Sequence, residues 1–119
     1  MKQVTTAKLL GERIGAEKLN RASEMLRTVA HPQRLAIMDA LGTEGRMCNG
    51  ELQALLGIEQ AILSQHLSLL RDKGLLTCAK EGKFSFWSIT QPEFLKIVAD
   101  LEKCCGHIGP WRSLDTSAL

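Results

Sequence analysis

One stretch, from Ile58 to Leu76, restricts the fold of this 119-residue chain more than any other. Its sequence is IEQAILSQHLSLLRDKGLL. When the residues are placed about 100° apart, as in an α-helix, they separate into two sides. The apolar side consists of Ile62, Leu63, His66, Leu67, Leu69 and Leu70. The stretch is therefore predicted to be an amphipathic helix that packs one side against a core.

The opposite side of this predicted helix carries almost no charge. It consists of Gln60, Ala61, Ser64, Gln65, Ser68 and Arg71. A helix face exposed only to water is usually rich in Lys and Glu, whereas these side chains are mostly short, neutral and able to form hydrogen bonds. Gln can bond adenine through two atoms and Ser can serve several bases, so the face suits a DNA major groove. The residues expected to contact bases are Gln60, Ser64, Gln65 and Ser68.

Two residues of the helix have competing interpretations. Arg71 lies at the rim of the polar face, where it can contact a DNA phosphate or form an ion pair with Asp72 or Asp39. His66 falls on the apolar side, which favours a packed histidine with bonded ring nitrogens over a base contact or a metal ligand. The polar face can also be an ordinary solvated surface, so the choice depends on the neighbouring elements.

The residues before this helix predict a shorter helix and a tight turn. The shorter helix is expected from about Asn49, as its N-cap, to Leu56, and Gly57 then ends it. A helix, a tight glycine turn and a second helix form the helix-turn-helix layout. In that layout the second helix is the one that reads bases, which favours DNA over the solvated surface.

The residues after the helix predict a β-hairpin. Two runs rich in β-forming residues, 75–80 and 84–89, flank a short connection that contains Gly82. A hairpin that directly follows a recognition helix is called a wing. Lys80 and Lys83, near its tip, are expected to contact phosphates, because cations on flexible stems suit sequence-independent contacts with the DNA backbone.

The rest of the chain is expected to be helical. Residues 1–19 form a weak helix that needs a partner, because glycines interrupt its apolar spacing. Two helices follow at residues 22–30 and 32–41, and the second ends at Gly42. The last helix covers residues 91–106 and carries an apolar stripe along one side.

Composition agrees with one small domain of packed helices. Hydrophobic residues make up 45% of the chain but few are aromatic, so the core must be mostly aliphatic. No run approaches about 18 apolar residues and no signal peptide is recognisable, so a cytoplasmic protein without a membrane partner is expected. The net charge of +2 does not by itself indicate a nucleic-acid partner. Without a glycine-rich phosphate loop or a Cys-x-x-Cys motif, an enzyme is the least supported class.

The order of these elements resembles the ArsR/SmtB family of bacterial transcriptional repressors. The segments that carry the resemblance are AHPQRLAIMDAL, GEL, LSQHLSLLRDKGLL and the hairpin before FWSI. It covers about Leu19 to Cys105 and implies a mainly α fold with a β-hairpin wing, a winged helix-turn-helix that dimerises through its first and last helices. It also implies that the homodimer binds an imperfect palindrome in double-stranded DNA and leaves it when an effector binds.

The resemblance divides the chain into four parts. Residues 1–20 are expected to be an N-terminal dimerisation helix and residues 21–90 the DNA-binding winged helix-turn-helix. Residues 91–106 are expected to be a C-terminal dimerisation helix, and residues 107–119 a flexible tail. A two-fold dimer places its recognition helices about 34 to 36 Å apart, which is one turn of DNA.

The four cysteines, expected to be thiols in a reducing compartment, suggest what the protein senses. Some family members bind arsenite, antimonite or soft metals through Cys-x-Cys before the first reading helix, but the matching stretch here is Cys48-Asn49-Gly50. Another branch binds zinc through Asp and His of the last helix, which here has no His before His107. A third branch links a cysteine of the second core helix to one near the end of the last helix. Here Asp39 stands about where the first of these would lie, and Cys104 and Cys105 match the second.

Three interpretations of the cysteines remain open. A disulfide between the neighbours Cys104 and Cys105 would be strained, whereas these two thiolates with Cys48 would suit a soft ion such as trivalent arsenic. They can instead form a thiol redox site, or pack as small hydrophobes in the dimer interface. Cys78, within a strand, is expected to pack, and His107 to take no part.

The sequence therefore predicts a DNA-binding repressor released by a thiol-directed effector. The effector is a soft metal or metalloid such as arsenite, or an oxidant or reactive sulfur species, and it acts at the C-terminal cysteines. The alternatives are a winged-helix module for protein interaction and a DNA-binding regulator that does not sense through cysteine.

Overall fold

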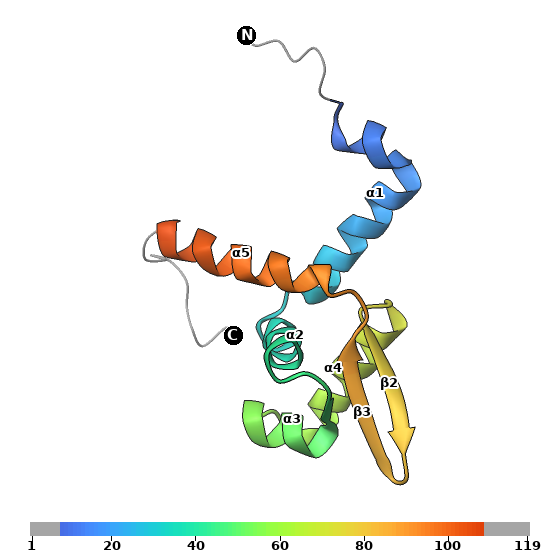
Figure 1. The fold of residues 1–119 in the computed structure, drawn as a ribbon, viewed down its shortest axis with the longest axis vertical. Helices are drawn as coiled ribbons and strands as arrows, with labels where there is room; N and C mark the ends of the chain where they lie inside the picture. Colours follow the sequence, from blue (N-terminus) through green and yellow to red (C-terminus); the bar gives the residue numbers. More distant parts are fainter. Residues whose placement is uncertain (1–7, 109–119) are drawn as a thin grey trace.

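The structure, a computed structural model, describes residues 8–108, and side chains through residue 106. It is mainly helical with one small antiparallel sheet (Figure 1). In chain order the elements are α1 (Leu10–Val29), α2 (Pro32–Glu44), β1 (Met47–Cys48), α3 (Asn49–Leu56), α4 (Gln60–Asp72), β2 (Leu76–Glu81), β3 (Phe84–Ile89) and α5 (Glu93–Ile108). The predicted winged helix-turn-helix is confirmed: α3 and α4 are its two helices, and the β2–β3 hairpin is its wing.

We call residues 32–89, from α2 to β3, the reading head. Its core is aliphatic, as predicted, and it holds together α2, α3, α4 and the inner side of the sheet. The side chains buried almost completely are Ile37, Met38, Leu52, Leu63, Leu67, Leu70 and Leu75. Trp87 of β3 closes the core on the side of the sheet, and Phe94 closes it where α5 begins.

The sheet contains a strand that the sequence did not predict. Its order is β1-β3-β2, and Met47 and Cys48 pair with Trp87 and Phe86 of β3. Two residues are too short to show an alternating pattern, so the sequence carries no signal for a strand here. The strand ties the start of α3 to the wing, and therefore fixes the wing relative to the helix-turn-helix.

We call α1 and α5 the arms, because both extend away from the reading head (Figure 1). The two helices expected at residues 1–19 and 22–30 form the single helix α1 over their described part, and Gly15 kinks it with a φ of 86° and a ψ of 160°. The exposed large apolar residues of α1 and of the residue before it are Leu9, Leu10, Leu19 and Leu26, and α5 adds Ile97 and Leu101. The arms are therefore the part of the described chain with the most uncovered apolar surface.

Three predicted helix ends were wrong. The helix α2 continues through Gly42 to Glu44 and is capped by Gly45, which has a φ of 84°, whereas at Gly42 the missing side chain makes room for Leu95 of α5. Asn49 lies within α3 rather than capping it, and its side chain accepts a hydrogen bond of 2.8 Å from the indole nitrogen of Trp87. The helix α5 continues past Gly106 to Ile108. The tail expected at residues 107–119 lies almost wholly outside the described residues.

Candidate nucleic-acid interface

The recognition helix α4 is held between a capped start and a glycine end. The Glu59 side chain accepts a hydrogen bond of 3.2 Å from the backbone nitrogen of Ile62, which caps the first turn. Before it, Gly57 adopts the left-handed conformation that ends α3, and after it Gly74 has a φ of 83°. These local signals fix where the helix begins and ends.

The two sides of α4 lie as the periodicity predicts, with one exception. Its buried residues are Leu63, His66, Leu67 and Leu70. On the other side Gln60, Ala61 and Gln65 are exposed, and Ser64 and Ser68 are half-buried. Ile62 was expected to face the core but is 43% exposed, because it lies about 100° from Leu63 at the flank of the buried stripe. The uncharged polar side of α4 is therefore open to a partner.

His66 is a packed histidine, as predicted. It is 7% exposed, its Nε2 atom lies 2.9 Å from Oε1 of Gln33, and its Nδ1 atom accepts a hydrogen bond of 3.2 Å from Nε of Arg34. Burial lowers the pKa of His66 below its ordinary value, and electrostatic interactions with His31 and Arg34 lower it further. These surroundings favour the neutral imidazole, which is buried inside the reading head on the side of α4 opposite the polar face.

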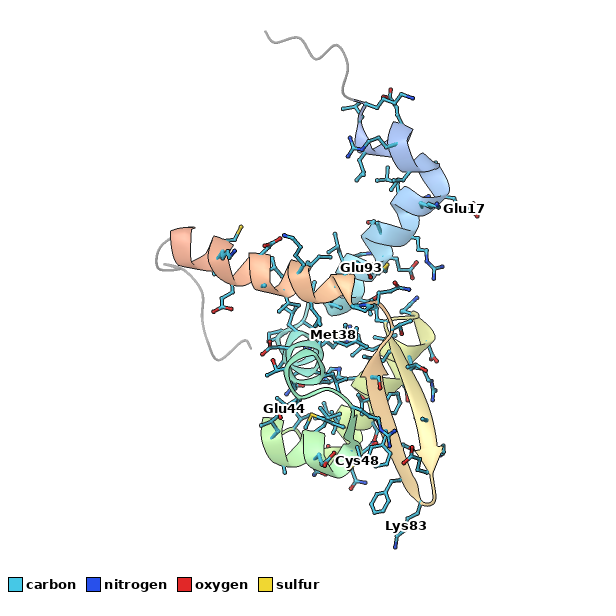
Figure 2. The ribbon with its side chains drawn as sticks, viewed as in Figure 1. Glu17, Met38, Glu44, Cys48, Lys83 and Glu93 are labelled. Carbon is cyan, nitrogen blue, oxygen red and sulfur yellow. The ribbon has the colours of Figure 1, made fainter. Side chains whose placement is uncertain are left out.

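The wing presents two exposed lysines near its tip. Figure 2 shows Lys83 extending from the end of the hairpin, and Lys80 is exposed on β2. The acidic residue between them, Glu81, forms an ion pair of 2.7 Å with Arg46. The guanidinium of Arg46 also lies 4.1 Å from the centre of the Phe86 ring. Because Glu81 is already paired, the two lysines dominate the charge at the tip.

Arg46 was not predicted as part of this region. It precedes β1, and its partners Glu81 and Phe86 lie more than thirty residues further along the chain, so their proximity depends on the unpredicted strand. Phe84, beside Lys83, is 52% exposed and adds an apolar ring to the tip. Neither the contacts of Arg46 nor the exposure of Phe84 can be predicted from the spacing of residues in the sequence.

Arg71 forms one of the interactions expected for it, the ion pair with Asp72. One guanidinium nitrogen lies 3.6 Å from the Asp72 carboxylate, and the guanidinium carbon lies 5.8 Å from the centre of the Trp87 ring. Both members of the pair are at least half exposed, and such surface pairs contribute little to stability. A phosphate can therefore replace Asp72 as the partner of Arg71 at small cost.

Comparison with known proteins agrees with this geometry. The family model described as "Bacterial regulatory protein, arsR family" matches residues 31–77, which run from the cap of α2 into the wing. The biofilm growth-associated repressor of Xylella fastidiosa is 33% identical over 82 residues, which are 69% of this chain and 71% of that protein. The chain belongs to the ArsR family.

Solved structures of similar proteins share the fold. The crystal structure of the transcriptional repressor BigR from Xylella fastidiosa has a TM-score of 0.70 at 30% identity and covers 81% of this chain and 96% of its own. HlyU from Vibrio cholerae has a TM-score of 0.68 at 29% identity and covers 75% and 96%. The ArsR-family relatives are DNA-binding transcriptional regulators and not enzymes, which agrees with the class expected from the sequence.

The candidate effector cysteines of this ArsR-family chain lie in two separate places. All four cysteines are free thiols, and Cys104 and Cys105 are exposed on α5. Cys48 is half-buried where β1 meets α3, at the end of the reading head away from the far end of α5 (Figure 2). In the described part of the chain no three His, Cys, Asp or Glu side chains are grouped so that they could hold a metal ion. A single chain therefore does not bring the three candidate thiols together.

Cys105 differs from Cys104 in its surroundings. It lines a hollow of about 350 Å³ between α2 and α5, together with Asp39 and Glu102. Asp39 is the residue that stands about where one branch of the family has a cysteine. Cys78 is half-buried on β2 and packs against the core, as predicted. The side chain of His107 lies outside the described residues.

No helix in the described part of the chain combines the length and the apolar character that crossing a membrane requires.

Proposed function

We propose that this ArsR-family protein is a homodimeric transcriptional repressor that binds an imperfect palindrome in double-stranded DNA. The helix α4 reads bases in the major groove through Gln60, Ser64, Gln65 and Ser68. Arg71, Lys80 and Lys83 contact phosphates. The observation that carries the proposal is the exposed, uncharged polar face of α4 within a complete winged helix-turn-helix.

The chemistry of that face supports base reading over a solvated surface. The residues that face outward on α4 are amides and hydroxyls, which match the donors and acceptors at base edges and carry no charge that must be desolvated. Positive charge lies beside this face, at Arg71 and at the wing, where the phosphates of a bound duplex run. In this arrangement the polar face of α4 reads the bases, whereas Arg71 and the wing lysines contact the DNA backbone.

The exposed apolar residues of the arms support a homodimer. Along α1 a hollow of about 550 Å³ is lined by Leu10, Leu19 and Leu26, among others. On α5, Ile97 and Leu101 are 40% and 44% exposed. A second copy of the chain would cover these residues and place two α4 helices about one DNA turn apart, near 34 to 36 Å.

The DNA test uses a duplex recovered from a random-sequence pool by repeated selection with the wild-type protein. Binding is expected to weaken steeply with salt between about 50 and 200 mM, because bound phosphates release counterions. Gln65→Ala combined with Ser64→Ala should weaken binding by at least about tenfold, since each well-placed base contact contributes about 1 to 3 kcal/mol.

A matched control pair alters exposed polar residues away from α4 and the wing, namely Thr43→Ala with Gln91→Ala. This pair should bind like the wild type. Equal binding by the Gln65 and Ser64 variant would overturn base reading by α4. If selection recovers no duplex and binding does not depend on salt, the chain is a protein-interaction module instead.

The dimer test places charge on the arms. Leu19→Glu with Leu26→Glu should produce monomers in sedimentation experiments and abolish cooperative binding to both half-sites. Leu55→Glu is a matched control, because Leu55 on α3 and Leu26 on α1 are both 54% exposed. A Leu19 and Leu26 variant that remains dimeric would contradict dimerisation through α1.

The proposal assigns release from DNA to a thiol-directed effector at Cys104 and Cys105. Both thiols are exposed and free, and Cys105 borders the hollow where α5 lies against α2. A metal, metalloid, oxidant or sulfur species bound there would alter how α5 lies on the reading head. A coupling of about 1 to 3 kcal/mol is enough to change DNA affinity by roughly five- to 150-fold.

The effector test measures protein mass, metal content and DNA binding before and after arsenite, peroxide or polysulfide. The wild type should change in mass or metal content and lose DNA affinity with at least one reagent, and Cys104→Ser with Cys105→Ser should not. Cys78→Ser is the control, and Cys48→Ser tests whether that thiol joins the site from a partner chain. If no reagent changes the wild type, the cysteines only pack.

A further inference from the structure

A partly buried polar cluster joins three helices of the molecule and makes none of the proposed DNA contacts. At its centre is His66 of α4, with Gln33 on one ring nitrogen at 2.9 Å and Arg34 on the other at 3.2 Å. Arg34 also donates a hydrogen bond of 2.9 Å to the carbonyl oxygen of Thr28 in α1. The cluster therefore links the recognition helix to α2 and, through Arg34, to an arm.

The hydrogen bonds require a neutral imidazole. Arg34 Nε can only donate, so Nδ1 of His66 must carry a lone pair rather than a proton. The Gln33 oxygen can only accept, so Nε2 of His66 carries the single proton. One tautomer of the neutral ring satisfies both partners, and the protonated ring cannot accept from Arg34.

The surroundings of the ring also oppose a positive charge. The titratable and charged groups that face it come from α2 and its cap, and they are Arg34 and His31, whose ring centre lies 4.8 Å from that of His66. From α1 the cluster receives the backbone carbonyl of Thr28, which Arg34 already occupies. Among the described contacts of the His66 ring there is no carboxylate. Protonation of His66 would place its positive charge beside that of Arg34 in a partly buried site.

We propose that Gln33, Arg34 and His66 form a proton-sensitive latch that holds α4 in its DNA-reading orientation, and that protonating His66 opens this latch and weakens DNA binding. The inference rests on the proposed DNA-binding function and adds positioning residues to it. None of the three is among the residues proposed to contact DNA. They act by fixing how α4 lies on α2, between the exposed reading face and the arm α1.

The sign of the effect distinguishes the latch from ordinary electrostatics. Protonating histidines adds positive charge and by itself strengthens binding to the DNA phosphates. The latch predicts the opposite, a loss of affinity as the pH falls below the ordinary histidine range. The other histidine of the cluster, His31, caps α2 by accepting a hydrogen bond of 3.1 Å from the backbone nitrogen of Gln33, and so provides an internal comparison.

The experiment measures binding of the selected duplex from about pH 7.5 to about pH 4.5, which covers the range in which histidines ordinarily titrate and extends below it. Wild-type affinity should fall by about tenfold, within the range typical of coupled sites. His66→Gln keeps one donor and one acceptor but cannot titrate, so it should bind at the higher pH and lose the pH dependence. His31→Asn keeps a capping side chain, so its DNA affinity should fall at low pH as in the wild type.

A second measurement follows the His66 ring by NMR. In the wild type its titration should be accompanied by shifts of the α2 and α4 backbone amides. In Arg34→Met, which removes both the neighbouring charge and the hydrogen bond to Nδ1, the ring titration should move to higher pH, and DNA binding should already be weaker at about pH 7.5. Thermal unfolding at each pH shows which variants remain folded.

Several results would overturn the latch. One is a loss of DNA affinity at low pH that is as large in His66→Gln as in the wild type, or that disappears in His31→Asn. Another is DNA binding that stays unchanged or tightens while His66 is protonated. A third is a titration of the His66 ring without shifts of the backbone amides. Failure of the proposed function would look different. In that case no duplex is selected at any pH, and the NMR titration alone decides whether the latch exists.

Discussion

The reading head and the arms differ in how completely their apolar side chains are covered. In the head, Ile37, Leu52 and Leu67 have no exposed surface, and every buried side-chain nitrogen or oxygen of the described residues has a hydrogen-bond partner. In the arms, Leu26 and Leu101 are 54% and 44% exposed. A single chain thus covers the centre of the head, although Leu55, Ile62 and Phe84 at its surface are exposed, and it leaves most of the other exposed large apolar residues on the arms. The difference agrees with the proposal that the arms serve for dimerisation, whereas the core of the head forms within one chain.

The largest expected effect comes from removing core volume in the head. Leu67→Ala should lower the free energy of unfolding by about 2 to 5 kcal/mol, because the side chain is fully buried and leaves a cavity. Leu26→Ala in an arm should change it by less than about 0.5 kcal/mol where the chain is monomeric. Urea unfolding at low protein concentration measures both values. Similar losses at the two positions would remove the distinction between head and arms.

The next effect is at the joint where an arm meets the head. A Cβ atom added at Gly42 would lie 2.1 Å from a terminal carbon of Leu95, so Gly42→Ala must displace α5 or the Leu95 side chain. Overpacking costs about 1 to 3 kcal/mol, and the helix preference of Ala offsets up to about 1 kcal/mol of it, which leaves a net loss of stability.

Unfolding experiments on Gly42→Ala should include two comparisons. Adding Leu95→Ala removes the contacting atoms and should abolish the clash at Gly42. Gly50→Ala in α3 is the matched control, because nothing lies within 4 Å of its added Cβ atom, and it should not destabilise. A stabilised Gly42→Ala would show that the flexible end of the Leu95 side chain moves aside at little cost.

The head was also the part that the sequence predicted best. The 3.6-residue period identified the core side of α4, and glycines 57 and 74 marked its limits. The prediction that a helix ends at Gly42 was wrong, because the sequence alone does not distinguish a glycine within a helix from a glycine that ends one. At Gly42 the reason for the glycine is the contact with Leu95 of another helix. The strand β1 was missed because two residues carry no period. Both errors concern contacts between residues far apart in the chain.

The candidate site divides in the same way. The polar face of α4 and the wing lysines follow from local periodicity and turn chemistry, so they could be predicted. Arg46, by contrast, gains Glu81 and Phe86 as neighbours only through the sheet. The cysteines were recognised as candidates, but their separation within one chain depends on where α5 points, which no local pattern encodes.

A smaller effect should appear in the pH dependence of the head. The pKa of His66 is lowered from 6.5, chiefly by burial, so the unfolded chain binds this proton more readily than the folded one. The free energy of unfolding is therefore at its full value above about pH 6.5, where His66 is neutral in both states. It decreases as the pH falls toward the lowered pKa of His66 in the folded chain. Thermal unfolding against pH should show this loss in the wild type and not in His66→Gln. A loss that persists in the variant belongs to other groups.

The smallest expected effect is at the ion pair that ties an arm to the head. Glu24 of α1 lies 2.5 Å from the amino group of Lys73 at the end of α4, and this hydrogen bond and charge lower the pKa of Glu24 below 4.5. The pair therefore stabilises above pH 4.5, and the contribution is lost as the pH falls through the lowered pKa. Both side chains are more than a third exposed, so water and salt screen the attraction.

Glu24→Gln should consequently change global unfolding very little but speed amide exchange in the last turns of α1. Asp100→Asn is the matched control, because Asp100 pairs with Lys96 at 3.0 Å within α5 alone and bridges no two elements. The difference between the variants should disappear in about 1 M salt, where charges are screened within about 3 Å. If Glu24→Gln leaves exchange in α1 unchanged at low salt, the arm is held by the packing of Met25 and Val29 against the core rather than by its charge.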